Sequence, residues 1–280
     1  MSRLYEALRR MEREKVQPGA SAPDTTPAAE MIGSVVADRN AATEASIRVE
    51  TMAPSSRLVA LTDPKSLGAE KFRALVTRLE NLRAKQELKS LQLISTGTSE
   101  GKTLIAGNLA VTLAKYSACK VLLIEGDLHR PRLGLLFGLG PLRGLSHWWN
   151  TPDDDIWNYV YALQHDNSLC ILPAGEVPDQ PLQILQSARF TQAFARLLGR
   201  FDWIIVDSTP MLPMADTNLW SRLVDGTLLV VREGVASIDG LKKGLEGLDH
   251  PKLLGIVLND ASSFEDGDYK YAYSGYKESE

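Results

Sequence analysis

The chain has few cysteines, no long apolar run and no excess of positive charge, and each absence excludes a class of protein. Two cysteines, Cys119 and Cys170, are too few for a disulfide framework, and both lie beside or within apolar runs where a buried thiol is ordinary. No apolar run approaches the ~18 residues of a membrane-spanning helix, and the N-terminus lacks the apolar core of a signal peptide. The net charge of −4 argues against broad binding of nucleic acid. We therefore expect a soluble, cytoplasmic protein without a nucleic-acid partner.

Composition divides the 280 residues into four segments. Residues 1–15 are a charged, amphipathic helix candidate with apolar residues at helical spacing. Residues 16–60 are rich in Pro, Ala, Ser and Thr without apolar periodicity, which is typical of a flexible linker. Residues 61–262 carry alternating strand-like and helix-like patterns, and residues 263–280 are a polar, tyrosine-rich tail. The sequence thus predicts one sizeable α/β domain with an extension at each end.

Short apolar runs alternate with amphipathic stretches throughout the central segment. The apolar runs predict strands at 91–95, 121–124, 169–172, 203–206, 226–231 and 253–258. The amphipathic stretches predict helices over 62–85, 102–116, 181–198, 214–223 and 238–248. The first of these helices has a start signal at Thr62-Asp63-Pro64, where a capping residue precedes proline. Alternation of this kind favours a mainly parallel sheet flanked by helices, as in P-loop NTPases.

A glycine-containing segment, GTSEGKTL, joins the first predicted strand to a helix. Backbone N–H groups at such a turn, together with the positive end of the helix, hold phosphate groups. We expect Lys102 to reach the outer phosphates and the Thr103 hydroxyl to help bind Mg²⁺. The strict phosphate-loop pattern has glycine where this chain has Thr96, and a positive φ at Ser99 would cost about 1 kcal/mol or more. The expected nucleotide-binding residues are Gly97, Thr98, Ser99, Glu100, Gly101, Lys102, Thr103 and Leu104.

Carboxylates follow two of the predicted strands. Glu125 and Asp127 come after one strand, and Asp207 ends another. Ligands bind at the carboxyl ends of parallel strands, and Mg²⁺ bound to phosphates needs carboxylate ligands there. We expect Glu125 and Asp207 to serve the metal with Thr103, and Asp127 to accept the proton of a reacting hydroxyl. Lys102, Asp127 and Asp207 are therefore the predicted catalytic residues, although each acid also suits a helix cap or a turn.

Four tyrosines lie within eight residues of the acidic tail: Tyr269, Tyr271, Tyr273 and Tyr276. Tyrosine normally needs apolar companions to bury its ring, and this tail offers none. One interpretation is a tail whose tyrosines are incidental. The other is a set of phosphate acceptors, because a carboxylate beside the γ-phosphate of a nucleotide could take the proton of a phenol whose ordinary pKa is about 10.

In this order and spacing, the motifs over residues 60–280 resemble those of the bacterial tyrosine kinases of capsular and exopolysaccharide synthesis. STGTSEGKT resembles their Walker A motif, LLIEGDLHRP their Walker A′ motif, WIIVDSTP their Walker B motif and YKYAYSGY their tyrosine cluster. The resemblance implies ATP and Mg²⁺, and autophosphorylation between subunits of a homo-oligomer. It also implies an activating membrane polysaccharide co-polymerase that recruits the chain to the inner face of the plasma membrane, and an opposing protein-tyrosine phosphatase. It places Asn259 near the adenine.

Four residues depart from that family pattern. Ser99 replaces a loop glycine, Glu125 an aspartate, His129 an arginine and Val76 the last arginine of the oligomerisation signature E-x-x-R-x-x-R. A kinase of reduced activity is therefore one expectation. Two other classes stay open. A ParA- or MinD-like ATPase would carry a signature lysine where this chain has Gly97, and a degenerate, non-catalytic assembly factor would bind nucleotide without transferring phosphate.

Overall fold

The computed structural model describes residues 47–163, 168–211, 215–246 and 252–261. The helix predicted over residues 1–15, most of the predicted linker and all four tail tyrosines lie outside the described residues.

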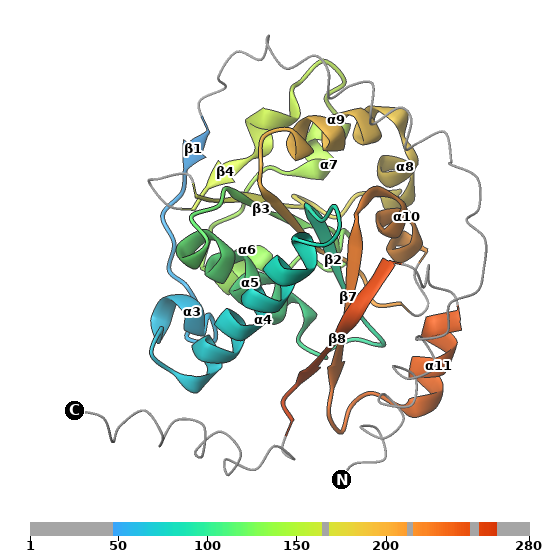
Figure 1. Ribbon diagram of the computed structural model, residues 1–280. Helices are drawn as coiled ribbons and strands as arrows, with labels where there is room; N and C mark the ends of the chain where they lie inside the picture. The colour runs from blue at the N-terminus through green and yellow to red at the C-terminus, as the bar shows by residue number, and fades with distance from the viewer. Residues whose placement is uncertain (1–46, 164–167, 212–214, 247–251, 262–280) are drawn as a thin grey trace, which may run out of the picture.

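The described residues form one eight-stranded sheet in the order β1-β4-β5-β3-β6-β2-β7-β8 (Figure 1). The strands are β1 (Arg48–Val49), β2 (Ser90–Ser95), β3 (Val121–Glu125), β4 (Tyr161–Ala162), β5 (Leu169–Leu172), β6 (Trp203–Asp207), β7 (Gly226–Arg232) and β8 (Leu253–Asn259). All neighbouring pairs run parallel except β4 and β5. The mainly parallel sheet predicted from the alternating pattern is thus confirmed.

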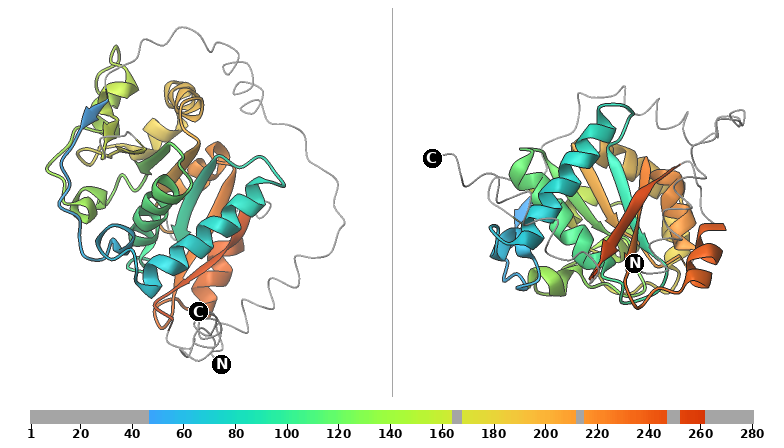
Figure 2. Two further views of the ribbon diagram at one scale, coloured as in Figure 1. Left: turned by 60° about the vertical axis from the view of Figure 1, so that its left-hand side comes forward. Right: turned by 60° about the horizontal axis from the view of Figure 1, so that its bottom comes forward.

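Helices cover both faces of the sheet (Figures 1 and 2). They are α3 (Val59–Thr62), α4 (Leu67–Arg83), α5 (Lys102–Tyr116), α6 (Leu133–Phe137), α7 (Leu145–Trp149), α8 (Pro181–Gln186), α9 (Ala188–Leu198), α10 (Asp216–Leu223) and α11 (Ile238–Glu246), with a 3₁₀ turn at Ile156–Tyr159. Side chains alternate along each strand, so Leu123 and Ile205 pack toward α5 while Ile124 and Val206 pack toward α7–α10. Each central strand is therefore buried on both faces, which explains its continuous apolar run.

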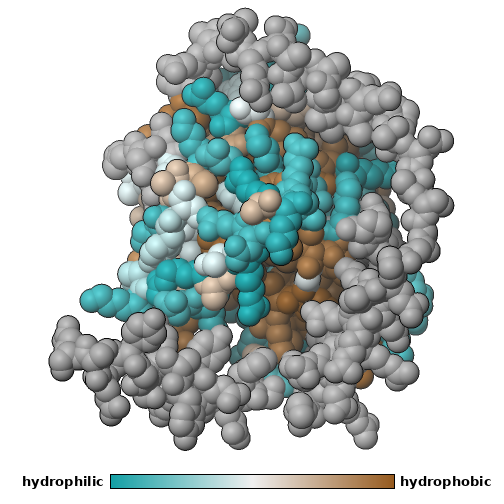
Figure 3. Space-filling model, viewed as in Figure 1, coloured by the Kyte–Doolittle hydropathy of each residue, from teal (hydrophilic) through white to brown (hydrophobic). Residues whose placement is uncertain are grey.

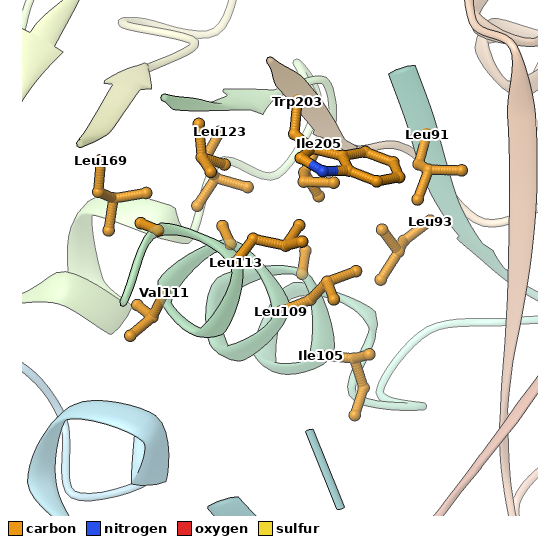
Figure 4. Packing of buried hydrophobic residues seen from close by; sticks show 14 of the residues in the cluster. Leu91, Leu93, Ile105, Leu109, Val111, Leu113, Leu123, Leu169, Trp203 and Ile205 are labelled. Atoms are coloured by element: carbon orange, nitrogen blue, oxygen red, sulfur yellow. The ribbon is translucent and has the colours of Figure 1, made fainter. Parts of the chain in front are cut away.

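Helix α5 lies directly against the sheet (Figure 4). Leu109 and Leu113 point toward the strands that carry Leu123 and Ile205, and all four are fully buried. Gly107 of the same helix faces the side chains of Leu58 and Leu136, which a Cβ would meet at 3.1 and 2.8 Å. This packing fixes the position of the helix N-terminus, where Lys102 stands.

Two predicted helix boundaries are wrong. Helix α4 is capped by Ser66, whose Oγ accepts a hydrogen bond from the N–H of Ala69, because Asp63 and Pro64 lie in the turn after α3. The helix predicted over 181–198 is two helices, because Ser187 has an extended backbone and caps α9 through the N–H of Phe190.

Residues 47–60 belong to the fold, although the sequence predicted a linker up to residue 60. Leu58 is fully buried, and the buried Asn108 side chain accepts from the N–H of Ala60 and donates to the carbonyl of Arg57, both at 3.1 Å. The side-chain amide of Asn108 on α5 thus holds this segment through two hydrogen bonds. The composition of residues 47–60 does not predict these contacts.

The surface seen in Figure 3 is hydrophilic over much of its centre, and hydrophobic residues show beside β8. This strand lies at the edge of the sheet, and its residues are partly exposed. Within the described ranges, no helix combines the length and apolarity needed to cross a bilayer.

Candidate functional site

The loop between β2 and α5 has the backbone geometry of a phosphate-binding turn. Ser99 has a φ of +66° and Gly101 a φ of +90°, so the serine adopts the backbone angle that the sequence argument described as costly. A Cβ on Gly101 would lie 2.2 Å from Nδ2 of Asn259, and glycine is therefore required there on two grounds. Ser95 Oγ donates to the carbonyl of Gly97 at 2.7 Å and closes the start of the turn.

Glu100 is a buried carboxylate that holds this loop together. Its Oε1 accepts from the N–H of Gly97 at 2.5 Å, and its Oε2 accepts from the N–H of Arg232 at 3.2 Å. Burial raises the pKa of Glu100, and these hydrogen bonds act in the opposite direction. Asn259 Nδ2 donates to the Glu100 carbonyl at 2.8 Å. The backbone N–H of Arg232 at the end of β7 and the side chain of Asn259 at the end of β8 thus support the loop.

Lys102, the first residue of α5, lies between two carboxylates. Its Nζ is 2.7 Å from Asp207 Oδ1 and 4.0 Å from Asp127 Oδ2. Lys102 is 7% exposed and Asp207 1%, so this charge pair has little solvent around it. The three predicted catalytic residues therefore meet at one point, where β2, β3 and β6 end.

Asp127 and Asp207 differ in their access to solvent. The Asp127 side chain is 13% exposed and lines the cavity beside the loop, whereas that of Asp207 is 2% exposed and lies behind Lys102. Burial raises the pKa of Asp127, and the nearby Lys102 partly offsets the shift. Asp127 is thus the more accessible of the two carboxylates, and its pKa lies above that of an ordinary aspartate.

Glu125, predicted as a metal ligand, is held by two backbone N–H groups. Its Oε1 accepts from the N–H of Leu133 at 2.6 Å and its Oε2 from the N–H of Ala174 at 3.0 Å. It is 3% exposed and lines a second cavity of about 320 Å³ instead of the one beside the loop. Both oxygens of Glu125 are thus engaged by backbone donors.

The cavity beside the loop has a volume of about 400 Å³. All eight predicted loop residues, 97–104, line it together with Asp127, whereas Asn259 stands behind the loop. Its lining also includes Ser55, Arg57, Ser95, Arg130, Arg132, Leu135, Leu136, Pro210 and Arg232. In the part of the chain that the structure describes, no three acidic, histidine or cysteine side chains are grouped to hold a metal by themselves. A cation here would be coordinated by phosphate oxygens of a ligand as well as by protein oxygens, as Mg²⁺ usually is.

Sequence reasoning missed four arginines of this lining: Arg57, Arg130, Arg132 and Arg232. Arg232 is the last residue of β7, at the same rim as Asp207, so the strand-end argument could have identified it. Arg130 and Arg132 follow Asp127 within five residues and could have been found in the same way. Arg57 lies in the segment taken for linker, and no signal in the sequence pointed to it.

Two departures from the family pattern have structural partners. His129 Nε2 is 3.0 Å from Oδ2 of the buried Asp216. Val76 is 4% exposed within the hydrophobic core, on a helix where Glu70 and Arg73 form an ion pair. Arg73 also donates to the hydroxyl of Tyr116 at 3.2 Å. A charged side chain at position 76 would have to leave the core.

Comparisons with known proteins match this chain to one family model and to tyrosine-protein kinases. Residues 88–262 match the family model of the cellulose biosynthesis protein BcsQ. CapB of Staphylococcus aureus is 31% identical over 215 residues, which cover 75% of this chain and 92% of CapB. The tyrosine-protein kinase YwqD of Bacillus subtilis is 29% identical over 216 residues, which cover 76% of this chain and 90% of YwqD.

Among solved structures, a tyrosine-kinase domain is more similar to this chain than MinD is. The kinase domain of the Escherichia coli tyrosine kinase ETK superposes with a TM-score of 0.65 at 25% identity, over 88% of this chain and 98% of that domain. MinD of Pyrococcus horikoshii, complexed with Mg-ADP, reaches a TM-score of 0.50 at 24% identity over 61% of this chain. The MinD likeness is one of fold alone.

Proposed function

Because the chain belongs to the family that the BcsQ model describes and to the bacterial tyrosine kinases of capsule and exopolysaccharide synthesis, we propose that it transfers the γ-phosphate of ATP to tyrosines of its own tail. The observation that carries the proposal is the convergence of Lys102, Asp127 and Asp207 beside a phosphate-binding loop. Lys102 begins the helix that follows β2, Asp127 follows β3 and Asp207 ends β6, so all three lie at the edge of the sheet where parallel strands bind ligands.

The residues around the cavity fit ATP with Mg²⁺. The loop backbone and Lys102 would hold the phosphates, and the Thr103 hydroxyl with Asp207 would hold the metal. When bound, Mg²⁺ neutralises phosphate charge. Asp207 ends the neighbouring strand β6, and Glu125 accepts two backbone N–H groups nearby.

Phosphate transfer needs a base for the phenol proton. The tyrosine oxygen attacks the γ-phosphorus, the bond to the β–γ bridging oxygen breaks, and ADP leaves while the proton passes to a carboxylate. Asp127 suits this role, because it lines the cavity and burial raises its pKa. Asp207 keeps Lys102 in position and completes the metal site. Lys102 stabilises the negative charge that spreads over the transferred group.

The acceptors in this proposal are Tyr269, Tyr271, Tyr273 and Tyr276. They belong to an acidic tail at the end of the chain, and a neighbouring copy in a homo-oligomer presents them. Family membership further supports a membrane polysaccharide co-polymerase as activator, a protein-tyrosine phosphatase as antagonist, and a place at the cytoplasmic side of the plasma membrane.

A ParA- or MinD-like ATPase is the second candidate. Against it stand Gly97, where the signature lysine of those ATPases would lie, and the closer likeness to kinase domains. A nucleotide-binding assembly factor without transfer activity is the third. The three functions differ in what happens to the γ-phosphate.

The test is incubation of the purified full-length chain with Mg-ATP, followed by mass spectrometry of the tail peptide. We expect phosphate on at least one tail tyrosine, and none in a Lys102→Met variant prepared in parallel. ATP hydrolysis without tyrosine phosphorylation would replace the kinase with the ATPase. Binding of ATP with neither reaction would favour the assembly factor.

A further inference from the structure

Three arginines on one side of the main cavity have no anionic partner among the residues that the structure describes. Arg57, Arg130 and Arg132 line it and are exposed, and within the described residues no hydrogen bond or ion pair engages their guanidinium groups. Arg232, on the other side, forms an ion pair with Asp260. Unpaired guanidinium groups that converge on one cavity indicate an anionic ligand.

The sheet order separates these arginines from Arg232. Strands β3, β6, β2 and β7 are consecutive neighbours, and the phosphate loop follows β2. Asp127 and helix α6 follow β3, while Arg232 ends β7. Arg130 and Arg132, which lie between Asp127 and α6, are therefore on the Asp127 side of the loop, and the Arg57 segment is hydrogen-bonded to α6 on the same side. A phenol that gives its proton to Asp127 must approach from that side.

The backbone around Arg57 is held rigidly. Its carbonyl accepts from Asn108 Nδ2 at 3.1 Å, and the N–H of Ser55 donates to the carbonyl of Leu136 at 3.0 Å. Gly138, with a φ of +65°, lies so close to Ala53 that a Cβ would overlap the carbonyl oxygen. The segment is thus fastened to both α5 and α6, and Arg57 stands at a defined place on the cavity wall.

Leu135 adds an apolar element to the same wall. It is 82% exposed, the highest value among the exposed large hydrophobic residues of the described chain, and it lies on α6 between the two cavities. Leu136 beside it also lines the main cavity. An exposed leucine next to arginines suits a ligand with both apolar and anionic groups.

We propose that Arg57, Arg132, Leu135 and Leu136 form an acceptor surface that binds the acidic tyrosine tail, residues 262–280, of a second copy of this chain. The tail carries five carboxylates against two lysines, and Glu265, Asp266 and Asp268 immediately precede its first tyrosine. The arginines pair with these carboxylates, and Leu135 packs against the rings beside the reacting tyrosine. This inference rests on the proposed kinase function and specifies its acceptor as an acidic, tyrosine-containing peptide.

The test compares two peptides and four proteins. One peptide has the sequence of residues 262–280, and the other carries Glu265→Gln, Asp266→Asn and Asp268→Asn. The parent protein is the full-length chain with phenylalanine at the four tail tyrosines and the same three amides, so that its own tail neither accepts phosphate nor offers these carboxylates. The other three are this parent with Arg57→Gln and Arg132→Gln together, with Leu135→Ser, and with the control Arg200→Gln, which removes an exposed arginine remote from the cavity.

We expect the parent and the Arg200→Gln control to prefer the acidic peptide by about fivefold in kcat/KM, as two partly exposed ion pairs would provide. The double arginine variant should lose this preference, with a larger rise in the KM for peptide than in the KM for ATP. Leu135→Ser should raise the KM for both peptides alike. An unchanged preference in the double variant would overturn the proposal. So would a KM for ATP that rises as much as the KM for peptide, because the arginines would then hold the nucleotide.

Failure of the kinase function gives a different result. No form of the protein would then phosphorylate either peptide. Fluorescence anisotropy still tests whether the proposed surface binds the acidic peptide. Both labelled peptides are titrated with the same four proteins in the presence of ADP and Mg²⁺. Tighter binding of the acidic peptide that disappears in the double arginine variant supports it, and equal binding of the two peptides to the parent contradicts it.

Discussion

Lys102 and Asp207 form an ion pair of 2.7 Å at the head of the phosphate-loop helix, with Asp127 at 4.0 Å from the same nitrogen. Both members of the pair are nearly inaccessible to solvent. The lysine therefore neutralises two carboxylates in this structure. Under the proposed function it is also the cation that binds phosphate.

Replacement of Lys102 by methionine should affect stability and catalysis together. Loss of one partner of a buried pair leaves an uncompensated charge, and we expect the free energy of unfolding to fall by about 3 kcal/mol. Phosphate transfer should fall at least ~100-fold, since a donor to the transition state is lost. Urea denaturation and a tyrosine phosphorylation assay measure the two effects. Adding Asp207→Asn should restore part of the stability without restoring transfer, and a Lys102→Met variant as stable as the parent would contradict the pairing.

The pH dependence of transfer tests Asp127 as the base. Only the carboxylate form accepts a proton, so kcat should fall as the pH drops through the pKa of Asp127. Because burial raises that pKa, the fall should begin at a higher pH than for an ordinary aspartate of pKa about 3.9. Asp127→Asn should reduce kcat by about 100- to 10,000-fold and remove this acidic limb. The exposed Asp153→Asn is the matched control. An acidic limb that survives in Asp127→Asn would assign the base elsewhere.

Much of the fold was predictable because the central strands are buried on both faces and therefore read as apolar runs. Strands β1 and β4 have two residues each, too few to form a pattern. The hydrogen bonds of Glu125 were not predicted because its partner Ala174 lies 49 residues further on, and no local spacing encodes that contact. Arg57 was missed because the segment that carries it is ordered by the buried amide of Asn108 on another element. What escaped prediction in these cases depends on single contacts between distant residues.

Substitution of Ser99 tests how much the positive φ at this position lowers the free energy of unfolding. Its φ of +66° disfavours residues with a Cβ, whereas Thr98 is not among the residues of positive φ. Ser99→Gly should raise the free energy of unfolding by up to about 1 kcal/mol, since the relief of strain exceeds the added freedom of the unfolded chain. Thr98→Gly, the matched control, should lower it by about 0.5–1 kcal/mol, because only the unfolded state gains. Thermal unfolding of both variants measures the difference. If Ser99→Gly destabilises as much as Thr98→Gly, the loop holds position 99 without strain.

Substitution of Glu125 distinguishes a residue that supports the backbone from one that binds the metal. Both its oxygens accept N–H groups, from Leu133 and Ala174. In Glu125→Gln the amide nitrogen faces one of these donors, and a buried N–H left without an acceptor costs about 1–3 kcal/mol. We expect that loss of stability in urea denaturation, with a Mg²⁺ dependence of transfer that stays within about twofold of the parent, since the metal is held by other residues. The exposed Glu87→Gln should change neither quantity. A variant of normal stability that needs much more Mg²⁺ would instead place Glu125 at the metal, and the carboxylate would then have to leave both backbone donors when nucleotide binds.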